Sequence, residues 1–322
     1  MRIAFAIIIS LLSLQLSAQD TTMATANTAV ERTVVEKQPV RIFSSERVIL
    51  SNTTEPVGKG KMKFIVSHYF DDAGGSTGGF KNFFGLDNSQ DVWIGFRVGL
   101  TDRLDATIAR AKSGHPRPQL RMEKLYELAL KYQLLQQIEK DPSHPIALSV
   151  FFSNVISGMD TAKTTVYDFK DFGDRMSQVY QLIIAKKIGK ISLQLSPTIT
   201  RQGYLAPHDL QRTMFSLGGV IRFPVSRTIS IVLDYFHPFR SQESEDAFKS
   251  TSNFNPPIKF HDPLGIGFEI NTSGHVFYLN FTNATQIQEA RFIPYNVKDW
   301  GDGEFRWGFT ISRKFILWRD KK

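Results

Sequence analysis

The stretch 91–110 reads DVWIGFRVGLTDRLDATIAR, and it predicts two β-strands joined by a tight turn. Apolar side chains occupy every second position from Val92 to Leu100. A period of two is that of a strand, because successive side chains point to opposite faces. The polar triplet 101–103 supplies the turn, and alternation resumes in 104–110. This hairpin is the repeating unit of the chain.

The same rhythm recurs up to residue 316, with short turns and long loops in strict alternation. Such alternation is typical of a transmembrane β-barrel with short periplasmic turns and long extracellular loops, and an even number of strands returns both termini to the periplasm. We therefore predict an all-β protein, a transmembrane antiparallel up-and-down β-barrel of about 12 strands. The expected strands are 62–69, 91–100, 104–110, 124–135, 146–155, 175–186, 190–199, 212–223, 228–237, 262–271, 274–283 and 304–316.

A soluble β-sandwich is the alternative fold, since its strands also alternate. Two features favour the membrane barrel. Aromatic residues such as Tyr126, Phe223 and Trp307 lie near the ends of the apolar faces, as at membrane interfaces. The opposite faces are small and mixed polar, as a lumen would be. The segment 124–135 has a helix-like composition, but its apolar residues fall on even positions, which favours a strand.

Residues 1–19 have a basic start, an apolar run and a small-residue exit, which predict a cleaved signal peptide. The run is too short for a spanning helix, which needs about 20 apolar residues. We expect residues 20–57 to be a flexible periplasmic lead-in, within which 40–50 forms a short strand or lies against the barrel base. Residues 58–322 would form the barrel, located in a bacterial outer membrane.

The composition narrows the chemistry. The chain has no cysteine, which excludes thiolate metal sites, iron–sulfur clusters and cysteine nucleophiles. None of its seven histidines lies in a metal-binding motif, so we predict no metal and no cofactor. A net charge of +8 favours anionic partners, and we expect outer-membrane lipid and lipopolysaccharide but no nucleic acid. The sequence predicts no oligomeric state.

Three stretches carry a family resemblance: Ser67-His68-Tyr69-Phe70, residues 83–87 (FFGLD) and residues 98–104 (VGLTDRL). With Ala109-Arg110 and residues 131–136, they resemble the family named "domain of unknown function 5777", which comprises predicted outer-membrane β-barrels of Bacteroidota. The resemblance covers roughly residues 42–318, and it departs from the family pattern at Tyr69 and Asp71. It implies the fold and the location, and it implies no activity.

The alternation also predicts which charged side chains enter the lumen. There are four of each sign, and unpaired charges in a narrow lumen would be costly, so we expect ion pairs across the barrel. These pairs either brace the barrel or form opposed walls of a pore that selects small polar or zwitterionic solutes. The eight residues are Arg97, Asp105, Glu127, Lys131, Arg222, Asp234, Glu269 and Arg306.

Further candidates lie towards the extracellular side. His68 ends the first strand, as a rim histidine bonded to a loop or, alternatively, as a ligand or base. The loop with three phenylalanines should fold inward or onto another loop to bury them, and the basic loop could dock lipopolysaccharide phosphates or another anion. These loop candidates are Phe80, Phe83, Phe84, Asp87, Arg110, Lys112, Arg117 and Arg121.

The leading functional hypothesis is a channel or facilitator for small polar solutes, which an open lumen would favour. A non-conducting barrel that binds or assembles with envelope proteins is the second, favoured by a lumen occluded by ion pairs and the Phe80–Phe84 loop. We predict no catalytic residue. An outer-membrane lipid hydrolase is the third hypothesis, with His275 on the lipid-facing side as a candidate, and it requires a Ser–His pair within hydrogen-bond distance there.

Overall fold

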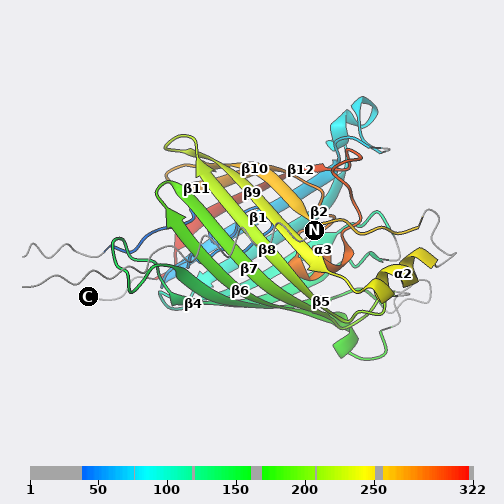
Figure 1. Ribbon diagram of the computed structural model, residues 1–322, viewed down its shortest axis with the longest axis horizontal. Coiled ribbons are helices and arrows are strands. Elements are labelled where there is room, and N and C mark those ends of the chain that lie inside the picture. Colours follow the sequence, from blue (N-terminus) through cyan, green and yellow to red (C-terminus); the bar gives the residue numbers. More distant parts are fainter. Residues whose placement is uncertain are drawn as a thin grey trace, which may run out of the picture. The chain divides into compact units, whose positions relative to one another are not determined.

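The computed structural model describes residues 38–75, 77–117, 120–160, 169–206, 209–250 and 257–318. In this part of the chain, twelve antiparallel strands form a closed barrel (Figure 1). The predicted signal peptide and the first part of the predicted lead-in lie outside the described residues. The strands are β1 Lys61–Asp72, β2 Ser89–Gly99, β3 Leu104–Ser113, β4 Leu125–Leu135, β5 Ala147–Ser157, β6 Met176–Ile188, β7 Ile191–Gln202, β8 Thr213–Pro224, β9 Ile229–Phe239, β10 Leu264–Asn271, β11 His275–Thr282 and β12 Arg306–Ile316.

Each strand pairs with its neighbour in sequence, and β1 pairs with β12 to close the barrel. The prediction of a 12-stranded up-and-down barrel is confirmed, and each predicted range overlaps one observed strand. The segment 124–135, whose composition favours a helix, forms β4. Its period of two decides, because a strand sends Glu127, Ala129 and Lys131 inward together, whereas a helix would turn Ala129 to the opposite face.

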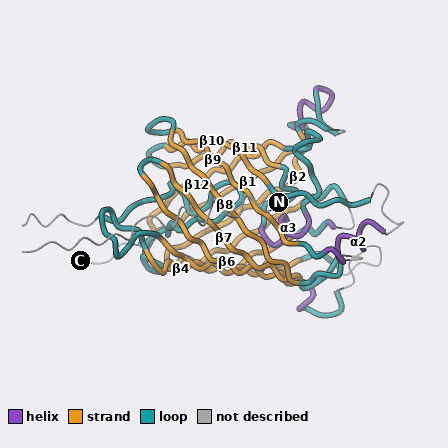
Figure 2. The backbone as a smooth tube through the Cα atoms, viewed as in Figure 1, coloured by secondary structure: helices purple, strands orange, loops and turns teal. Residues whose placement is uncertain are grey.

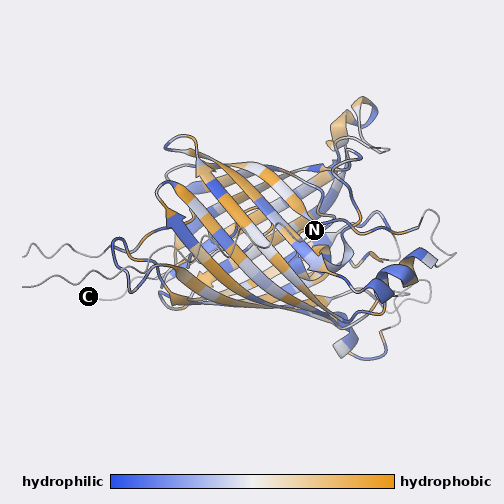
Figure 3. Cartoon of the chain, in the orientation of Figure 1, coloured by the Kyte–Doolittle hydropathy of each residue, from blue (hydrophilic) through white to orange (hydrophobic). Residues whose placement is uncertain are grey.

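The barrel has its polar face inside and its apolar face outside. Along β4, Leu128 and Leu130 are 50% and 49% exposed on the outer face, whereas Lys131 is 2% exposed inside. Figure 3 shows the resulting alternation of apolar and polar residues along the strands. A soluble protein would expose the polar face, so this inversion is that of a barrel whose outer wall contacts lipid.

The helices within the described residues all lie in long loops: η1 Phe80–Gly85, η3 Gly173–Arg175, α2 Gln242–Ser250 and α3 Glu289–Tyr295. They gather at the end of the barrel opposite the tight turns (Figure 2). We call the two ends the long-loop end and the short-turn end, the latter being periplasmic by the rule for such barrels. None of the helices in the described residues is long and apolar enough to cross a membrane.

Two chain segments fill the lumen. The first is residues 38–58, here called the N-terminal segment, in which nearly all residues from 42 to 54 are buried. The second is residues 283–298, between β11 and β12, here called the α3 loop. The structure therefore differs from the predicted lead-in, because residues 42–57 lie within the barrel, whereas Pro39 and Val40 pair with the turn 136–145 at the short-turn end. Their apolar side chains, such as Phe43 and Leu50, pack with the inward-facing Tyr69 and Trp93 in one core.

Candidate functional site

Asp234 is the wall residue most completely committed to the N-terminal segment. It lies on β9 and is fully buried. One carboxylate oxygen accepts hydrogen bonds from the backbone N–H of Leu50 (2.7 Å) and of Ser51 (2.8 Å). The other oxygen accepts a bond from the Ser51 hydroxyl at 2.7 Å. The carboxylate thus caps two backbone groups that have left water, which offsets the cost of burying them.

Arg97 and Lys131 bind the same segment as hydrogen-bond donors, whereas Asp234 binds it as an acceptor. Arg97 donates to the Glu46 carbonyl (3.0 Å) and to the Asn52 side-chain oxygen (2.8 Å). Lys131 donates to the carbonyls of Thr53, at 3.0 Å, and of Glu55. The cations therefore satisfy carbonyl groups while Asp234 satisfies N–H groups, as a complete accounting of buried backbone requires.

Asp105 completes this set at the end of the segment. It accepts a bond from the Val57 backbone N–H at 3.1 Å and lies 3.7 Å from the Lys131 ammonium. Asp105 and Lys131 face each other in the β3–β4 register. The N-terminal segment consequently passes from Leu50 to Val57 through a continuous series of charged contacts.

Glu127 and Arg306 hold the α3 loop. Glu127 accepts bonds from the Gln288 side chain (2.9 Å) and from the Trp93 indole (2.9 Å). Arg306 donates to the Thr285 carbonyl at 3.2 Å and pairs with Asp72 at 3.2 Å. Both inserted segments are thus fixed by the barrel wall.

The two inserted segments also contact each other. Arg47 of the N-terminal segment pairs with Glu289, the first residue of α3, at 3.4 Å, with both side chains at most 4% exposed. Arg47 donates further to the Ile287 carbonyl at 2.6 Å, and Asn52 donates to Glu289 at 2.9 Å. A buried charge that loses its partner is strongly destabilising, so displacing either segment affects the other.

The predicted ion pairs form for four of the eight residues, and they join strands that are adjacent or one strand apart rather than opposite walls of the barrel. Besides Asp105–Lys131, only Arg222–Glu269 (2.7 Å) pairs two of the eight predicted residues with each other. All eight side chains lie on the inner side of the wall, but five of them bond mainly to groups outside this set. The physical reason is that the backbone of two inserted segments offers buried donors and acceptors inside the lumen.

The phenylalanine loop does not bury its side chains, contrary to the prediction, and it does not occlude the lumen. Phe80 is 84% exposed and Phe83 57% exposed, and the loop projects from the long-loop end near β2 (Figure 1). Phe83 and Phe84 have positive φ angles of 44° and 54°, a conformation disfavoured for residues with a side chain. Asp87, which follows, is exposed.

The basic loop does not form one compact cluster of charges. Arg110 lies over the Tyr126 ring at 5.7 Å, and Arg121 is ion-paired with Glu123. Lys112 is exposed and Arg117 is partly exposed. Lipopolysaccharide docking here stays a prediction.

A Ser–His pair is present on the outer face, at a different histidine from the one expected. His68 of β1 contacts the Ser89 hydroxyl through Nε2 at 2.6 Å, and its other ring nitrogen has no hydrogen-bond partner among the described residues. A hydrolase needs a third group there to orient the base. His275 lies against Phe277, and its backbone N–H binds Thr272. The interpretation of His68 as a rim histidine fits best.

Sequence reasoning missed a polar cap at the long-loop end. Asp209 accepts bonds from the Tyr295 hydroxyl (3.0 Å) and the Ser244 hydroxyl (2.9 Å), which links α2 to α3. Nearby, His115 donates from Nε2 to the Tyr295 carbonyl (2.9 Å) and accepts the Arg117 N–H on Nδ1 (3.0 Å). Burial lowers the pKa of His115 to about 3, so it is neutral. These residues come from separate long loops, and no sequence pattern joins them.

The inverted polarity and the closed 12-stranded sheet define a membrane-bound β-barrel, here with its lumen filled by its own chain. The chain belongs to the family described as "Membrane bound beta barrel domain" (DUF5777), which matches residues 43–315. This agrees with the resemblance seen in the sequence. No group of three or more candidate ligands within the described ranges is placed to hold a metal ion.

Several solved structures are similar in fold. An outer membrane channel from Pseudomonas putida F1 has a TM-score of 0.47 and 12% identity, over 81% of this chain and 98% of that one. The KdgM porin has a TM-score of 0.46 and 7% identity, over 79% and 99%. The NanC porin has a TM-score of 0.44 and 6% identity, over 79% and 98%. A search of curated protein sequences finds no match.

Proposed function

We propose that this protein is an outer-membrane channel or facilitator for small polar solutes, exported by a cleaved signal peptide and closed at rest by its N-terminal segment. The observation that carries the proposal is the way that this segment is held, by hydrogen bonds and ion pairs to Asp234, Arg97 and Lys131. Each such bond exchanges with bonds to water, and its net contribution is only about 0.5–3 kcal/mol. The segment is therefore held as a removable plug.

The wall behind the segment suits a polar solute. The inner face of β5 to β8 carries small hydroxyl and amide side chains, all of them buried in the closed barrel. Withdrawal of the segment would expose these groups as a hydrated surface with donors and acceptors for a polar molecule. Those of β5 to β7 are Ser149, Ser153, Ser177, Gln181, Ser192, Gln194, Ser196, Thr198 and Thr200.

The test is conductance of the purified protein in a planar lipid bilayer. The full chain should show a closed baseline with rare openings, and a variant that lacks residues 38–57 should open far more often, because of the two inserted segments only the α3 loop then remains in the lumen. Ser216→Ala is the matched control, because this buried inner-wall hydroxyl has no hydrogen-bond partner among the described residues. Silence of the deletion variant, once its barrel is shown to be folded by circular dichroism, would reject a channel that is closed by this segment.

A second function, a non-conducting barrel that binds envelope proteins, is favoured by two observations. The Arg47–Glu289 contact locks the two inserted segments together inside the lumen. Phe80, Phe83 and Phe84 form an exposed apolar loop, a feature typical of contact surfaces. Crosslinking from position 80 in intact cells would support this function if it captured one defined protein and if the deletion variant did not conduct.

A further inference from the structure

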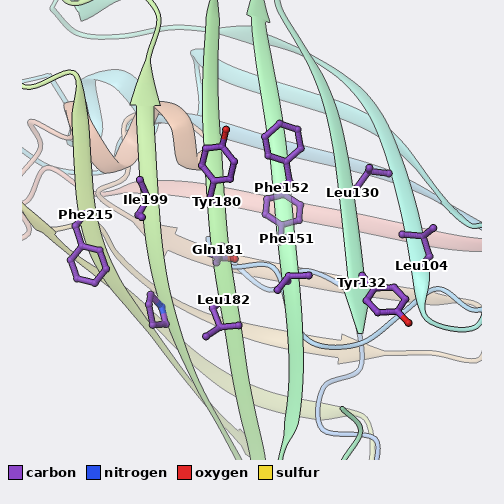
Figure 4. Close-up of a pocket in the computed structure, with 12 residues that line it drawn as sticks. Leu104, Leu130, Tyr132, Phe151, Phe152, Tyr180, Gln181, Leu182, Ile199 and Phe215 are labelled. Carbon is purple, nitrogen blue, oxygen red and sulfur yellow. The ribbon is translucent and has the colours of Figure 1, made fainter. Parts of the chain in front are cut away.

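An apolar groove crosses the outer wall of the barrel from β3 to β8. Its volume is about 570 Å³, within the usual range of about 300–1,000 Å³ for sites that bind small molecules. Figure 4 shows the rings of Tyr132, Phe152, Tyr180 and Phe215 along it. The side chains around it are outward-facing and half exposed, so the groove is continuous with the surface that contacts lipid.

The sheet is interrupted beneath this groove. The β6–β7 register pairs Gln181 with Thr198 and Ile184 with Leu195, but the two positions between them form no bridge. Pro197 of β7 lies at this interruption, and proline has no N–H to donate. Its pairing with Leu217 of β8 is intact, so the missing donor faces β6. Proline inside a sheet is otherwise confined to edges and bulges.

Two inward-facing residues also line the groove at this place. Phe151 and Gln181 face each other in the β5–β6 register, and both are at most 4% exposed. The Gln181 amide donates to the Thr198 hydroxyl at 2.9 Å, directly beside Pro197, while its oxygen has no hydrogen-bond partner among the described residues. The groove thus reaches inward to side chains of the lumen face, where a regular wall would be covered by its outer side chains.

We propose that this groove is a binding site for one acyl chain of a membrane lipid. The occupant follows from the location, because only hydrocarbon surrounds this wall and only an apolar chain can fill an apolar hollow without losing hydrogen bonds. Lipid tails gain nothing from hydrophobic exclusion inside a bilayer, so the selectivity comes from packing. Ten or so additional carbon–carbon contacts would favour the bound lipid about tenfold over a lipid on a flat part of the wall. This inference does not depend on whether the lumen conducts.

The test is photo-crosslinking in vesicles of phosphatidylethanolamine that carries a diazirine in its acyl chain. Peptide mapping should find labelling of the outward residues of β5 to β7 about tenfold above that of the outward residues of β9 and β10. Leu182→Trp fills the groove and should abolish this excess. Leu233→Trp is the matched control, because Leu182 and Leu233 are 36% and 37% exposed on the same outer face and only Leu182 lines the groove.

A second variant acts through the backbone. Pro197→Val restores the N–H that faces β6, so we expect the wall to close and the excess labelling to fall. Labelling that is equal around the barrel would show ordinary boundary lipid and overturn the proposal. Labelling of Leu182→Trp at the level of the unmodified protein would overturn it as well. A crosslinked dimer through β5 to β7 would do so too, by showing that a second copy fills the groove.

Discussion

Asp234→Ala offers a direct measure of what holds the N-terminal segment in place. The substitution removes three hydrogen bonds, two to backbone N–H groups and one to the Ser51 hydroxyl. A hydrogen bond to a charged group contributes about 1.5–3 kcal/mol, and the lower figure applies if water enters the space left by the carboxylate. Loss of the three bonds therefore destabilises the closed state by about 4–5 kcal/mol. Since about 1.4 kcal/mol corresponds to a factor of ten, the ratio of open to closed barrels rises roughly a thousandfold.

Two assays check this expectation. In planar bilayers, Asp234→Ala should raise the open probability, and Ser216→Ala should not. The second assay uses Thr54→Cys, which introduces the chain's only thiol at a fully buried position. A membrane-impermeant maleimide should label this thiol slowly in the parent and rapidly when Asp234→Ala is added. Unchanged conductance together with unchanged labelling would refute the reasoning that this carboxylate anchors the segment.

Three other predictions concern the cap, the wall and the contact between the inserted segments. The pKa of His115 is about 3 in the cap and 6.5 when the side chain is free, so the cap loses stability as the pH falls from 6.5 towards 3. The loss is at most about 5 kcal/mol. Limited proteolysis of the long loops should accelerate at pH 4, and His115→Gln should abolish that acceleration. Gly95→Ala places a methyl group 2.3 Å from the Trp93 ring and should cost about 1–3 kcal/mol of stability in a urea titration. Gly219→Ala places its methyl group 3.9 Å from the Gln194 carbonyl oxygen, an ordinary contact, and should be neutral. Glu289→Gln leaves the buried Arg47 guanidinium without its ion-pair partner and should favour the open state by about 3–5 kcal/mol, measured as increased conductance. A Glu289→Gln barrel that stays closed would count against the coupling of the two segments.

The strands were predictable because their signal is local. The alternation in 91–100 depends only on residues that follow one another, and the same period sends Arg97 inward without knowledge of any partner. The partner itself was not predictable. Arg97 binds the Glu46 carbonyl, 51 residues away, and backbone groups leave no trace in a side-chain pattern.

The error about the phenylalanine loop has a related origin. Sequence reasoning assumed that Phe80, Phe83 and Phe84 would be buried, as aromatic side chains in soluble proteins usually are. The lumen, however, is already filled by residues 42–54, whose apolar side chains occupy the space that the loop was expected to take. The only sequence indication that residues 42–54 fill the lumen is that apolar residues such as Ile42 and Phe43 are mixed with polar ones there without a clear strand period.

The β1–β12 contact closes the barrel by joining the first strand of the sheet to the last. The segment that fills the lumen is the first described part of the chain, and the strand that seals the wall is the last. The N-terminal segment is therefore enclosed by a wall whose closing strand lies at the other end of the described chain. Asp234, Arg97 and Lys131 lie on strands between these two ends of the chain. Their hydrogen bonds to the segment therefore do not involve the β1–β12 pairing. The segment thus ties β2, β4 and β9 together through the lumen, in addition to the hydrogen bonds that join neighbouring strands.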